Sequence, residues 1–186
     1  MRKVAVWAVL MAAMVGGCTI PPIRSDLHEP TTDANRGYAL LSFGPASAQH
    51  YTTHYNIRLA NQANSEVVSI LFTTGSLLVK PTEVDFSNRQ GHGAVYLVEL
   101  PAGAYYVERF RVYTPEAYSS IADIPFAIKP GQITYLGRFL VVREASVSAR
   151  RLNTFQEDLD IAKKKYEAEV KKNGIDPVVP ALGMEL

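Results

Sequence analysis

The chain has 186 residues, with 19 Lys or Arg and 18 Asp or Glu, for a formal net charge of +1. This balance supplies no basic field for nucleic acid or for an anionic lipid surface, so no nucleic-acid partner is expected. Cys18 is the one cysteine, which excludes a disulfide within the chain. The length suits one domain that relies on an apolar core.

Residues 1–17 have the three parts of a secretory signal peptide. Arg2 and Lys3 give a basic start, an apolar run covers 4–15, and two glycines precede Cys18. The run is shorter than the roughly 20 apolar residues of a membrane-spanning helix, so cleavage is expected. Two alternatives remain, an uncleaved anchor helix and a signal peptide in which the cysteine follows the cut site by chance.

The end of this segment, Val15-Gly16-Gly17-Cys18, resembles the lipobox of bacterial lipoproteins. The resemblance implies that diacylglycerol is attached to the Cys18 sulfur and that the amine freed by cleavage is acylated. Several acyl chains at ~0.8 kcal/mol per buried methylene hold a protein durably on a membrane. Position 19 is Thr19, whereas an Asp there resembles an inner-membrane retention signal. The expected location is therefore the outer membrane of a cell envelope, facing the periplasm.

Residues 18–36 are predicted to be a flexible tether behind the lipidated cysteine. They are mostly polar, they include Pro21, Pro22 and Pro30, and they show no helical or strand period. Proline favours an extended backbone, so the proline-rich part should span about 3 Å per residue.

From residue 37 to about 150, short apolar runs are separated by turn residues, which is typical of β-strands. The cleanest alternation is in 51–59, where Tyr55 and Ile57 share the apolar face and His54 and Arg58 share the polar face. Residues 85–93 and Ser119-Ser120 are predicted to lie in loops. The other expected strands are 38–43, 67–72, 95–100, 104–113, 126–128 and 133–141. Residues 77–79 are a candidate for one more short strand.

Two of these strands have informative side-chain patterns. In 104–113 the apolar positions change parity near Glu108, and one extra residue there, a β-bulge, would restore a single inward face. A strand with aromatic residues on both faces is the alternative. The clearest inward face in the chain is predicted for five alternate residues, namely Ile133, Tyr135, Gly137, Phe139 and Val141.

Six to eight strands with a turn about every ten residues predict an all-β sandwich, and no βα alternation suggests a parallel sheet. Glu-Leu-Pro-Ala-Gly-Ala-Tyr at 99–105 and Ile-Lys-Pro-Gly-Gln-Ile-Thr-Tyr-Leu-Gly at 128–137 resemble turns of uncharacterised bacterial lipoproteins. Their domains are prealbumin-like or carboxypeptidase-regulatory-like, and the turns open consecutive hairpin strands there. The resemblance implies a mainly β fold over 37–150, a prealbumin-like or immunoglobulin-like antiparallel β-sandwich.

One α-helix is expected after the sandwich, in the segment 151–174, and an irregular tail follows at 175–186. Thr154 and Glu157 fit a capping box, and Asn173-Gly174 is a stop signal. Apolar residues recur at helical spacing, which predicts an amphipathic helix over 154–173. We favour packing of this stripe on the sandwich. The alternative is docking to a partner protein, for which the candidate residues are Phe155, Leu159, Tyr166 and Val170.

The sequence offers no pattern for catalysis, for a cofactor or for a metal. Gly-x-Ser-x-Gly, His-Glu-x-x-His and a glycine-rich phosphate loop do not occur. His50 and His54 would stand ~13 Å apart on a strand, too far to share one ion. We therefore expect no catalytic, cofactor or metal site and no enzymatic activity.

Tyrosines gather in the second half of the chain, and two interpretations of them remain. The favoured one is core packing with polar tips, and the other is an aromatic platform for glycan or protein. The cluster consists of Tyr105, Tyr106, Tyr113, Tyr118 and Tyr135. The expected function is a membrane-anchored, non-enzymatic structural or protein-interaction module of the cell envelope. The alternative is a periplasmic binder of glycan or peptidoglycan fragments through exposed tyrosines.

Overall fold

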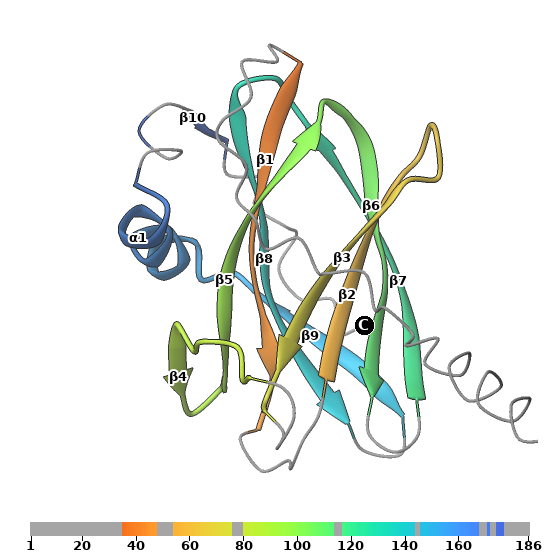
Figure 1. Cartoon of the computed structure of the whole chain (residues 1–186), viewed down its shortest axis with the longest axis vertical. Helices are drawn as coiled ribbons and strands as arrows, with labels where there is room; N and C mark the ends of the chain where they lie inside the picture. Colours follow the sequence, from red (N-terminus) through yellow and green to blue (C-terminus); the bar gives the residue numbers. More distant parts are fainter. Residues whose placement is uncertain are drawn as a thin grey trace, which may run out of the picture.

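A computed structural model describes residues 35–47, 54–75, 80–113, 117–143, 146–167, 171 and 174–176. In these residues two β-sheets face each other, and helix α1 (Phe155–Lys165) lies on the outer side of one sheet (Figure 1). The predicted mainly β sandwich with a C-terminal helix is confirmed, and the prealbumin-like or immunoglobulin-like type stays a prediction. The signal segment, Cys18, His50 and the short strand candidate lie outside the described residues.

The first sheet has the order β10-β8-β1-β5-β4, and β9 also pairs with β8. Its strands are β1 (Arg36–Pro45), β4 (Phe86–Asn88), β5 (Gly91–Pro101), β8 (Gln132–Arg143), β9 (Val147–Leu152) and β10 (Gly174–Asp176). Strand β1 runs antiparallel to β5, but β8 lies parallel to both β1 and β10. The expected antiparallel pairing therefore does not hold at β8, which enters this sheet from the other one.

The second sheet has the order β3-β2-β6-β7, and all its neighbours are antiparallel. Its strands are β2 (His54–Asn61), β3 (Val67–Thr73), β6 (Gly103–Tyr113) and β7 (Ala117–Ile128). The alternation predicted for β2 is confirmed in its described part. Tyr55 and Ile57 are buried between the sheets, while His54 and Arg58 are on the outer face.

Both turns noted in the sequence connect one sheet to the other. The turn after Pro101 joins β5 to β6, and the turn at Gly131 joins β7 to β8, so neither opens a hairpin within a sheet. Gly131 has φ +64°, a conformation that favours glycine. Its N–H donates to the carbonyl of Arg36 at 2.8 Å, and the Ala102 N–H donates to the carbonyl of Asn35 at 2.8 Å. The start of β1 is therefore held between the two turns.

The β-bulge predicted in β6 is confirmed. Arg58 and Leu59 are consecutive on β2 but pair with Arg109 and Val107, so Glu108 is the extra residue relative to β2. The register with β7 shifts at the same place. The apolar side chains before and after the bulge all join the core between the sheets, namely Tyr105, Val107, Phe110 and Val112.

Strand β8 has a bulge that the sequence interpretation missed. Its register with β1 shifts at Leu136, directly before Gly137, which has φ +108°. Ile133 and Tyr135 precede the bulge and face α1, whereas Phe139 follows it and lies between the sheets. The single inward face predicted for this strand is therefore wrong, because one inserted residue exchanges the two faces.

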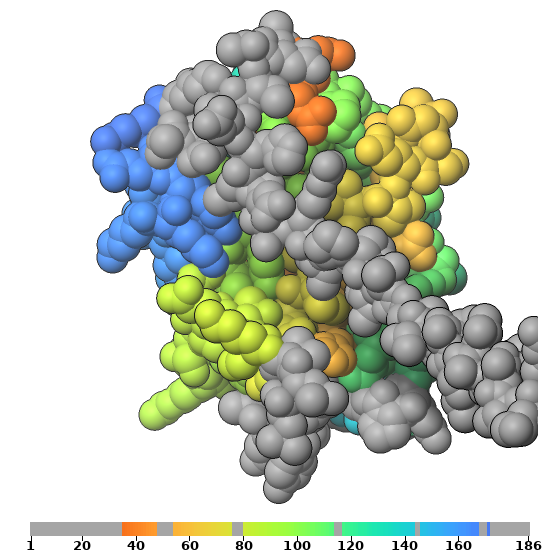
Figure 2. All heavy atoms as spheres, viewed as in Figure 1, coloured from red at the N-terminus to blue at the C-terminus, as the bar shows by residue number. Residues whose placement is uncertain are grey.

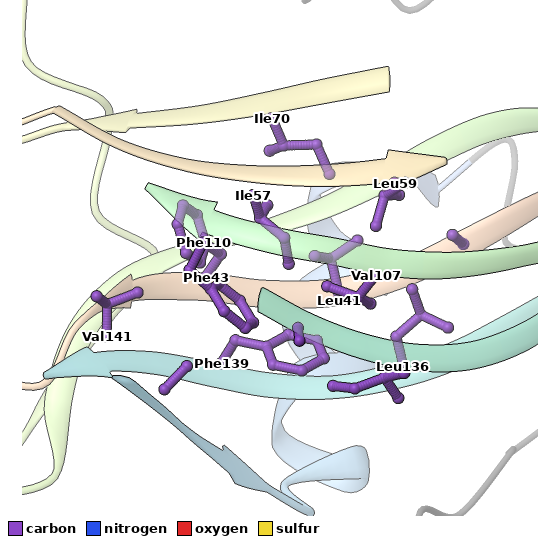
Figure 3. Packing of buried hydrophobic residues seen from close by; sticks show 14 of the residues in the cluster. Leu41, Phe43, Ile57, Leu59, Ile70, Val107, Phe110, Leu136, Phe139 and Val141 are labelled. Carbon is purple, nitrogen blue, oxygen red and sulfur yellow. The ribbon is translucent and has the colours of Figure 1, made fainter. Parts of the chain in front are cut away.

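The main core fills the space between the two sheets (Figure 3). The Phe110 ring lies between the rings of Phe43 and Phe139, with centroids 6.3 Å and 5.5 Å away. The labelled core residues come from both sheets and are Leu41, Phe43, Ile57, Leu59, Ile70, Val107, Phe110, Leu136, Phe139 and Val141. A second cluster lies between the first sheet and α1. Strand β1 is therefore buried on both faces.

Several element boundaries differ from the expectations. The predicted loop 85–93 contains β4 and the start of β5, and Ser119-Ser120 lies inside β7. Strand β9 reaches Leu152, within the expected helical segment. Strand β10 begins at Gly174, the expected helix stop, and continues to Asp176, so the first residues of the expected irregular tail are a strand. Strand pairing explains these differences, since β4, β7, β9 and β10 each gain a backbone partner that a single-segment pattern does not reveal.

Candidate functional site

The outer face of the first sheet is closed by α1 through a buried ion pair. Arg138 on β8 and Asp158 on α1 are both fully buried and form a salt bridge. The Arg138 Nε donates to Asp158 Oδ1 at 3.2 Å, and the guanidinium lies 3.9 Å from the centre of the Phe86 ring. Asp158 Oδ2 accepts hydrogen bonds from Tyr135 Oη at 2.8 Å and Thr154 Oγ1 at 2.9 Å. These contacts compensate for the loss of hydration of both charges.

The same network replaces the predicted capping box. The Thr154 hydroxyl donates to Asp158, and the Thr154 N–H donates to Tyr135 Oη at 3.3 Å. Glu157 does not reach back to Thr154, because its carboxylate accepts from Arg138 at 3.2 Å. The capping-box prediction is therefore wrong, since the buried guanidinium draws both carboxylates of the first turn toward the sheet.

The other end of α1 is fixed by two polar side chains. Tyr166 leaves helical geometry, with φ −129°, and its hydroxyl donates to the Val95 carbonyl at 3.1 Å. Lys165 Nζ lies 2.6 Å from Asp85 Oδ2, and the same carboxylate oxygen accepts from the Val95 N–H at 2.7 Å. Helix α1 therefore ends at Lys165, short of the predicted residue 173, and helical geometry returns beyond Tyr166 at Glu167 and Lys171. Figure 2 shows α1 in blue beside the yellow-green residues of β4 and the start of β5.

The predicted partner-docking stripe takes part in packing within the protein. Leu159 and Tyr166 are buried, and the Phe155 ring lies 5.2 Å from the Tyr135 ring, measured between centroids. Val170 lies outside the described side chains. The structure thus places this face on the first sheet, in accord with the interpretation that we favoured. A partner could reach the buried Leu159 and Tyr166 only after α1 left the sheet, whereas Phe155 is partly exposed.

The outer face of the second sheet is different, since none of the described elements covers it. Three cross-strand pairs of β2 and β6 point outward here: His54 with Tyr113, Asn56 with Arg111, and Arg58 with Arg109. We call these residues, together with Tyr106 and Glu108 on the same face of β6, the Arg–Tyr face. None of these residues belongs to either hydrophobic cluster, and Asn56 is buried among them. Next to them on β7, opposite Arg109, Ile121 is 78% exposed.

The charges of the Arg–Tyr face meet at the β6 bulge. Glu108, the inserted residue, lies 3.1 Å from Arg58 Nε and 2.6 Å from an Arg109 terminal nitrogen. Arg111 donates to the Tyr113 hydroxyl at 3.4 Å, and His54 Nδ1 lies 2.9 Å from Thr73 Oγ1. The bulge therefore places one carboxylate between two guanidinium groups.

The tyrosine cluster is divided between the interior and this face. Tyr105 and Tyr135 are buried, and Tyr118 packs partly against the core. Burial raises the pKa of both Tyr105 and Tyr135, and the Asp158 charge adds to the rise at Tyr135. Tyr106 and Tyr113 are partly exposed on the Arg–Tyr face. Of the predicted cluster, these two remain as candidates for a binding platform.

The described histidines lie on different sheets. His54 is on β2, and His92 is on β5, where its ring lies 5.9 Å from that of Phe72 and burial lowers its pKa. Nowhere in the described residues do three His, Cys, Asp or Glu side chains gather closely enough to hold a metal ion. None of the described helices has the length and apolar character needed to span a bilayer.

Sequence reasoning missed both groups of arginines. Arg138 lies in the predicted strand 133–141, directly before the apolar stretch 139–142. A charged residue inside such a strand is a signal for a buried ion pair. Arg58, Arg109 and Arg111 gave no comparable signal, because polar alternation is ordinary on the outer face of a sheet. Their grouping follows from the pairing of β2 with β6, which the sequence does not reveal.

Comparisons with known proteins name no family. No protein-family model matches the chain, and no curated protein matches it either. Among solved structures, a leucine-rich repeat protein from Bacteroides thetaiotaomicron is similar over 58% of this chain, with 15% sequence identity and a TM-score of 0.36. The similar region covers 14% of that protein. A likeness this low carries no argument about function.

Proposed function

We propose that this protein is a lipid-anchored component of the bacterial cell envelope whose β-sandwich serves as a non-enzymatic interaction module. The observation that carries the proposal is Val15-Gly16-Gly17-Cys18, a lipobox-like sequence directly behind an apolar run of signal-peptide length. The acyl chains on Cys18 would supply the membrane anchor, because several such chains bind a bilayer durably without a spanning helix.

The chain enters the β-sandwich at the end where the two inter-sheet turns lie. The carbonyls of Asn35 and Arg36 accept hydrogen bonds from the two inter-sheet turns, so the segment that follows the anchor joins the sandwich at that end. With the lipid at Cys18, the predicted tether reaches the sandwich at this end. Helix α1 packs on one outer face, and the Arg–Tyr face lies on the other, where none of the described elements covers it.

Cell fractionation with a Cys18→Ala variant tests the anchor. The unchanged protein should sediment with outer membranes, and its mature N-terminus should be an acylated cysteine by mass spectrometry. Cys18→Ala should release the protein from the membrane fraction, whereas Thr19→Ser serves as a matched control that leaves the anchor intact. An unmodified thiol in the mature protein, or a Cys18→Ala variant that stays on membranes, would contradict the proposal.

A second substitution tests the predicted leaflet. An Asp at position 19 resembles an inner-membrane retention signal, so Thr19→Asp should shift the protein from outer-membrane to inner-membrane fractions in a density gradient. The acyl modification itself should not change. An unaltered distribution would show that the residue after the cysteine does not direct this protein.

A further inference from the structure

We propose that the Arg–Tyr face binds an acidic glycan, meaning a sugar polymer that carries carboxylate or phosphate groups. The inference rests on the proposed envelope function and names the partner of its interaction module. It is carried by three features of the outer face of the second sheet, namely an excess of positive charge, the linear arrangement of that charge, and the tyrosines that flank it.

The first feature is an excess of positive charge among the described side chains of this face. Arg58 and Arg109 stand directly opposite each other, an arrangement that is unfavourable for like charges. Glu108 contacts both guanidinium groups but neutralises only one of them. Arg111 adds another positive charge on the same face, and the exposed Asp123 on the neighbouring strand β7 adds a negative one. The described strand residues of this face therefore present three arginines against two carboxylates. Guanidinium groups bind carboxylate and phosphate through paired hydrogen bonds, which makes an anion the fitting ligand.

The second feature is geometry. Arg58 and Arg109 are cross-strand neighbours, with Cβ atoms about 5 Å apart in such pairs. Arg111 is two residues further along β6, about 7 Å away on the same face. Tyr106 and Tyr113 stand on either side of the arginines, and the stretch between them spans about 23 Å of extended strand. A surface of this length suits a segment of an extended polymer with repeated anionic groups and not a single small ion.

The third feature is the kind of side chain beside the arginines. The tyrosine ring has an apolar face that can cover a sugar ring, and its hydroxyl can exchange hydrogen bonds with sugar hydroxyls. The partly exposed His54 extends the row of hydrogen-bonding groups along β2. Cations, an imidazole group and flanking aromatic rings together match a ligand that is anionic and rich in hydroxyls.

Other anionic partners fit this face less well. Lipid-binding basic segments commonly carry about 4–8 Lys or Arg, more than the net excess here. Proteins that bind nucleic acid through the backbone often neutralise about 6–10 phosphates, again more than this face offers. A protein partner usually requires an apolar anchor at the centre of the interface, whereas Ile121, which is 78% exposed opposite Arg109, lies on the edge strand β7.

Binding of the full mature chain in detergent to defined polymers tests the proposal. Polygalacturonate supplies a carboxylate on each sugar, phosphorylated dextran supplies phosphate, and fully methyl-esterified polygalacturonate provides the same backbone without charge. We expect binding to one or both acidic polymers, weaker binding at higher salt, and none to the ester. The Arg58→Gln/Arg111→Gln variant should bind at least about tenfold more weakly, given the strength of hydrogen bonds to charged groups.

Two further variants keep the result interpretable. Arg150→Gln removes an exposed charge from β9 on the other sheet and should leave the affinity unchanged. Glu108→Gln removes the competing carboxylate and should tighten binding, an effect that loss of folding cannot produce. The proposal is overturned if neither acidic polymer binds or if the methyl ester binds equally well. It is also overturned if Arg150→Gln weakens binding as much as the double variant does. Tighter binding of anionic vesicles or polyglutamate than of both polymers would overturn it as well. Because these measurements use purified protein, their outcome is independent of the Cys18→Ala fractionation.

Discussion

The two outer faces of the sandwich both place arginines beside carboxylates, but they differ in burial. On the first sheet, Arg138 and Asp158 are each 0% exposed beneath α1. On the second sheet, the side chains of Arg58, Glu108 and Arg109 are 24%, 18% and 31% exposed. Water can still reach the second group and screen it, whereas the buried pair depends wholly on protein partners. The same residue types therefore hold an element in place on one face and stay available for binding on the other.

The largest effect should come from breaking the buried pair. Asp158→Ala leaves the Arg138 charge buried with a single, half-exposed carboxylate partner, and we expect the free energy of unfolding to fall by about 3–5 kcal/mol. Urea unfolding followed by circular dichroism measures the change. Glu157→Gln, the matched control at the exposed partner, should cost about 1 kcal/mol or less. An equally small loss for Asp158→Ala would show that α1 is not held by this pair.

Removing an apolar contact between α1 and the first sheet should lower the free energy of unfolding somewhat less. Leu159 is on the buried side of α1, so Leu159→Ala should lower the free energy of unfolding by about 2–3 kcal/mol. The exposed helix residue Lys163 is the control, since Lys163→Ala should change it by less than about 0.5 kcal/mol. Equal effects of the two substitutions would mean that the helix is not packed on the sheet.

The burial of the network beneath α1 should also affect how the free energy of unfolding depends on pH in alkaline solution. Burial, and then the Asp158 charge, raise the pKa of Tyr135, so the folded protein holds this proton more tightly than the unfolded chain does. The resulting stability is fully present below the unfolded value of about 10 and is lost as the pH rises above it. Each such tyrosine contributes a slope of up to about 1.4 kcal/mol per pH unit. Tyr135→Phe should therefore flatten the fall of unfolding free energy above pH 10, and an unchanged slope would contradict burial of this hydroxyl.

The smallest effect on stability should come from the Arg–Tyr face. Glu108→Gln removes the carboxylate from a partly exposed ion group, and we expect the free energy of unfolding to change by about 1 kcal/mol or less. Urea unfolding at low and high salt measures it, and the difference should shrink at high salt. A loss as large as that of Asp158→Ala would show that the charges of this face are structural, which would weaken the case for a binding role.

The sequence predicted the sandwich well where side chains mark both faces of a strand. In β6 the change of parity between Val107 and Phe110 required an extra residue, and Glu108 is that residue. In β8 the alternation ran through Gly137, which has no side chain to report a face. The bulge at Leu136 therefore stayed hidden, although a glycine inside a strand is itself a recognised sign of a bulge.

The candidate site was less predictable, because its residues meet only through pairing of distant segments. Thr154 and Glu157 matched a local helix-start pattern, and that match obscured the long-range partner of Asp158. Similarly, Arg58 and Arg109 are 51 positions apart in the sequence and become neighbours only when β2 pairs with β6. Helical periodicity also gave no sign of the break at Tyr166, where α1 ends and the tyrosine hydroxyl donates to β5. Beyond that break, Glu167 and Lys171 are again helical.

The contrast between the two faces can be measured most directly by NMR of the arginine Nε–Hε signals during titration with the acidic polymer that binds. The account predicts that the signals of Arg58, Arg109 and Arg111 shift with saturation, while that of Arg138 beneath α1 does not. Equal shifts at Arg138, or no shift at the three arginines of the Arg–Tyr face once the polymer is bound, would contradict it.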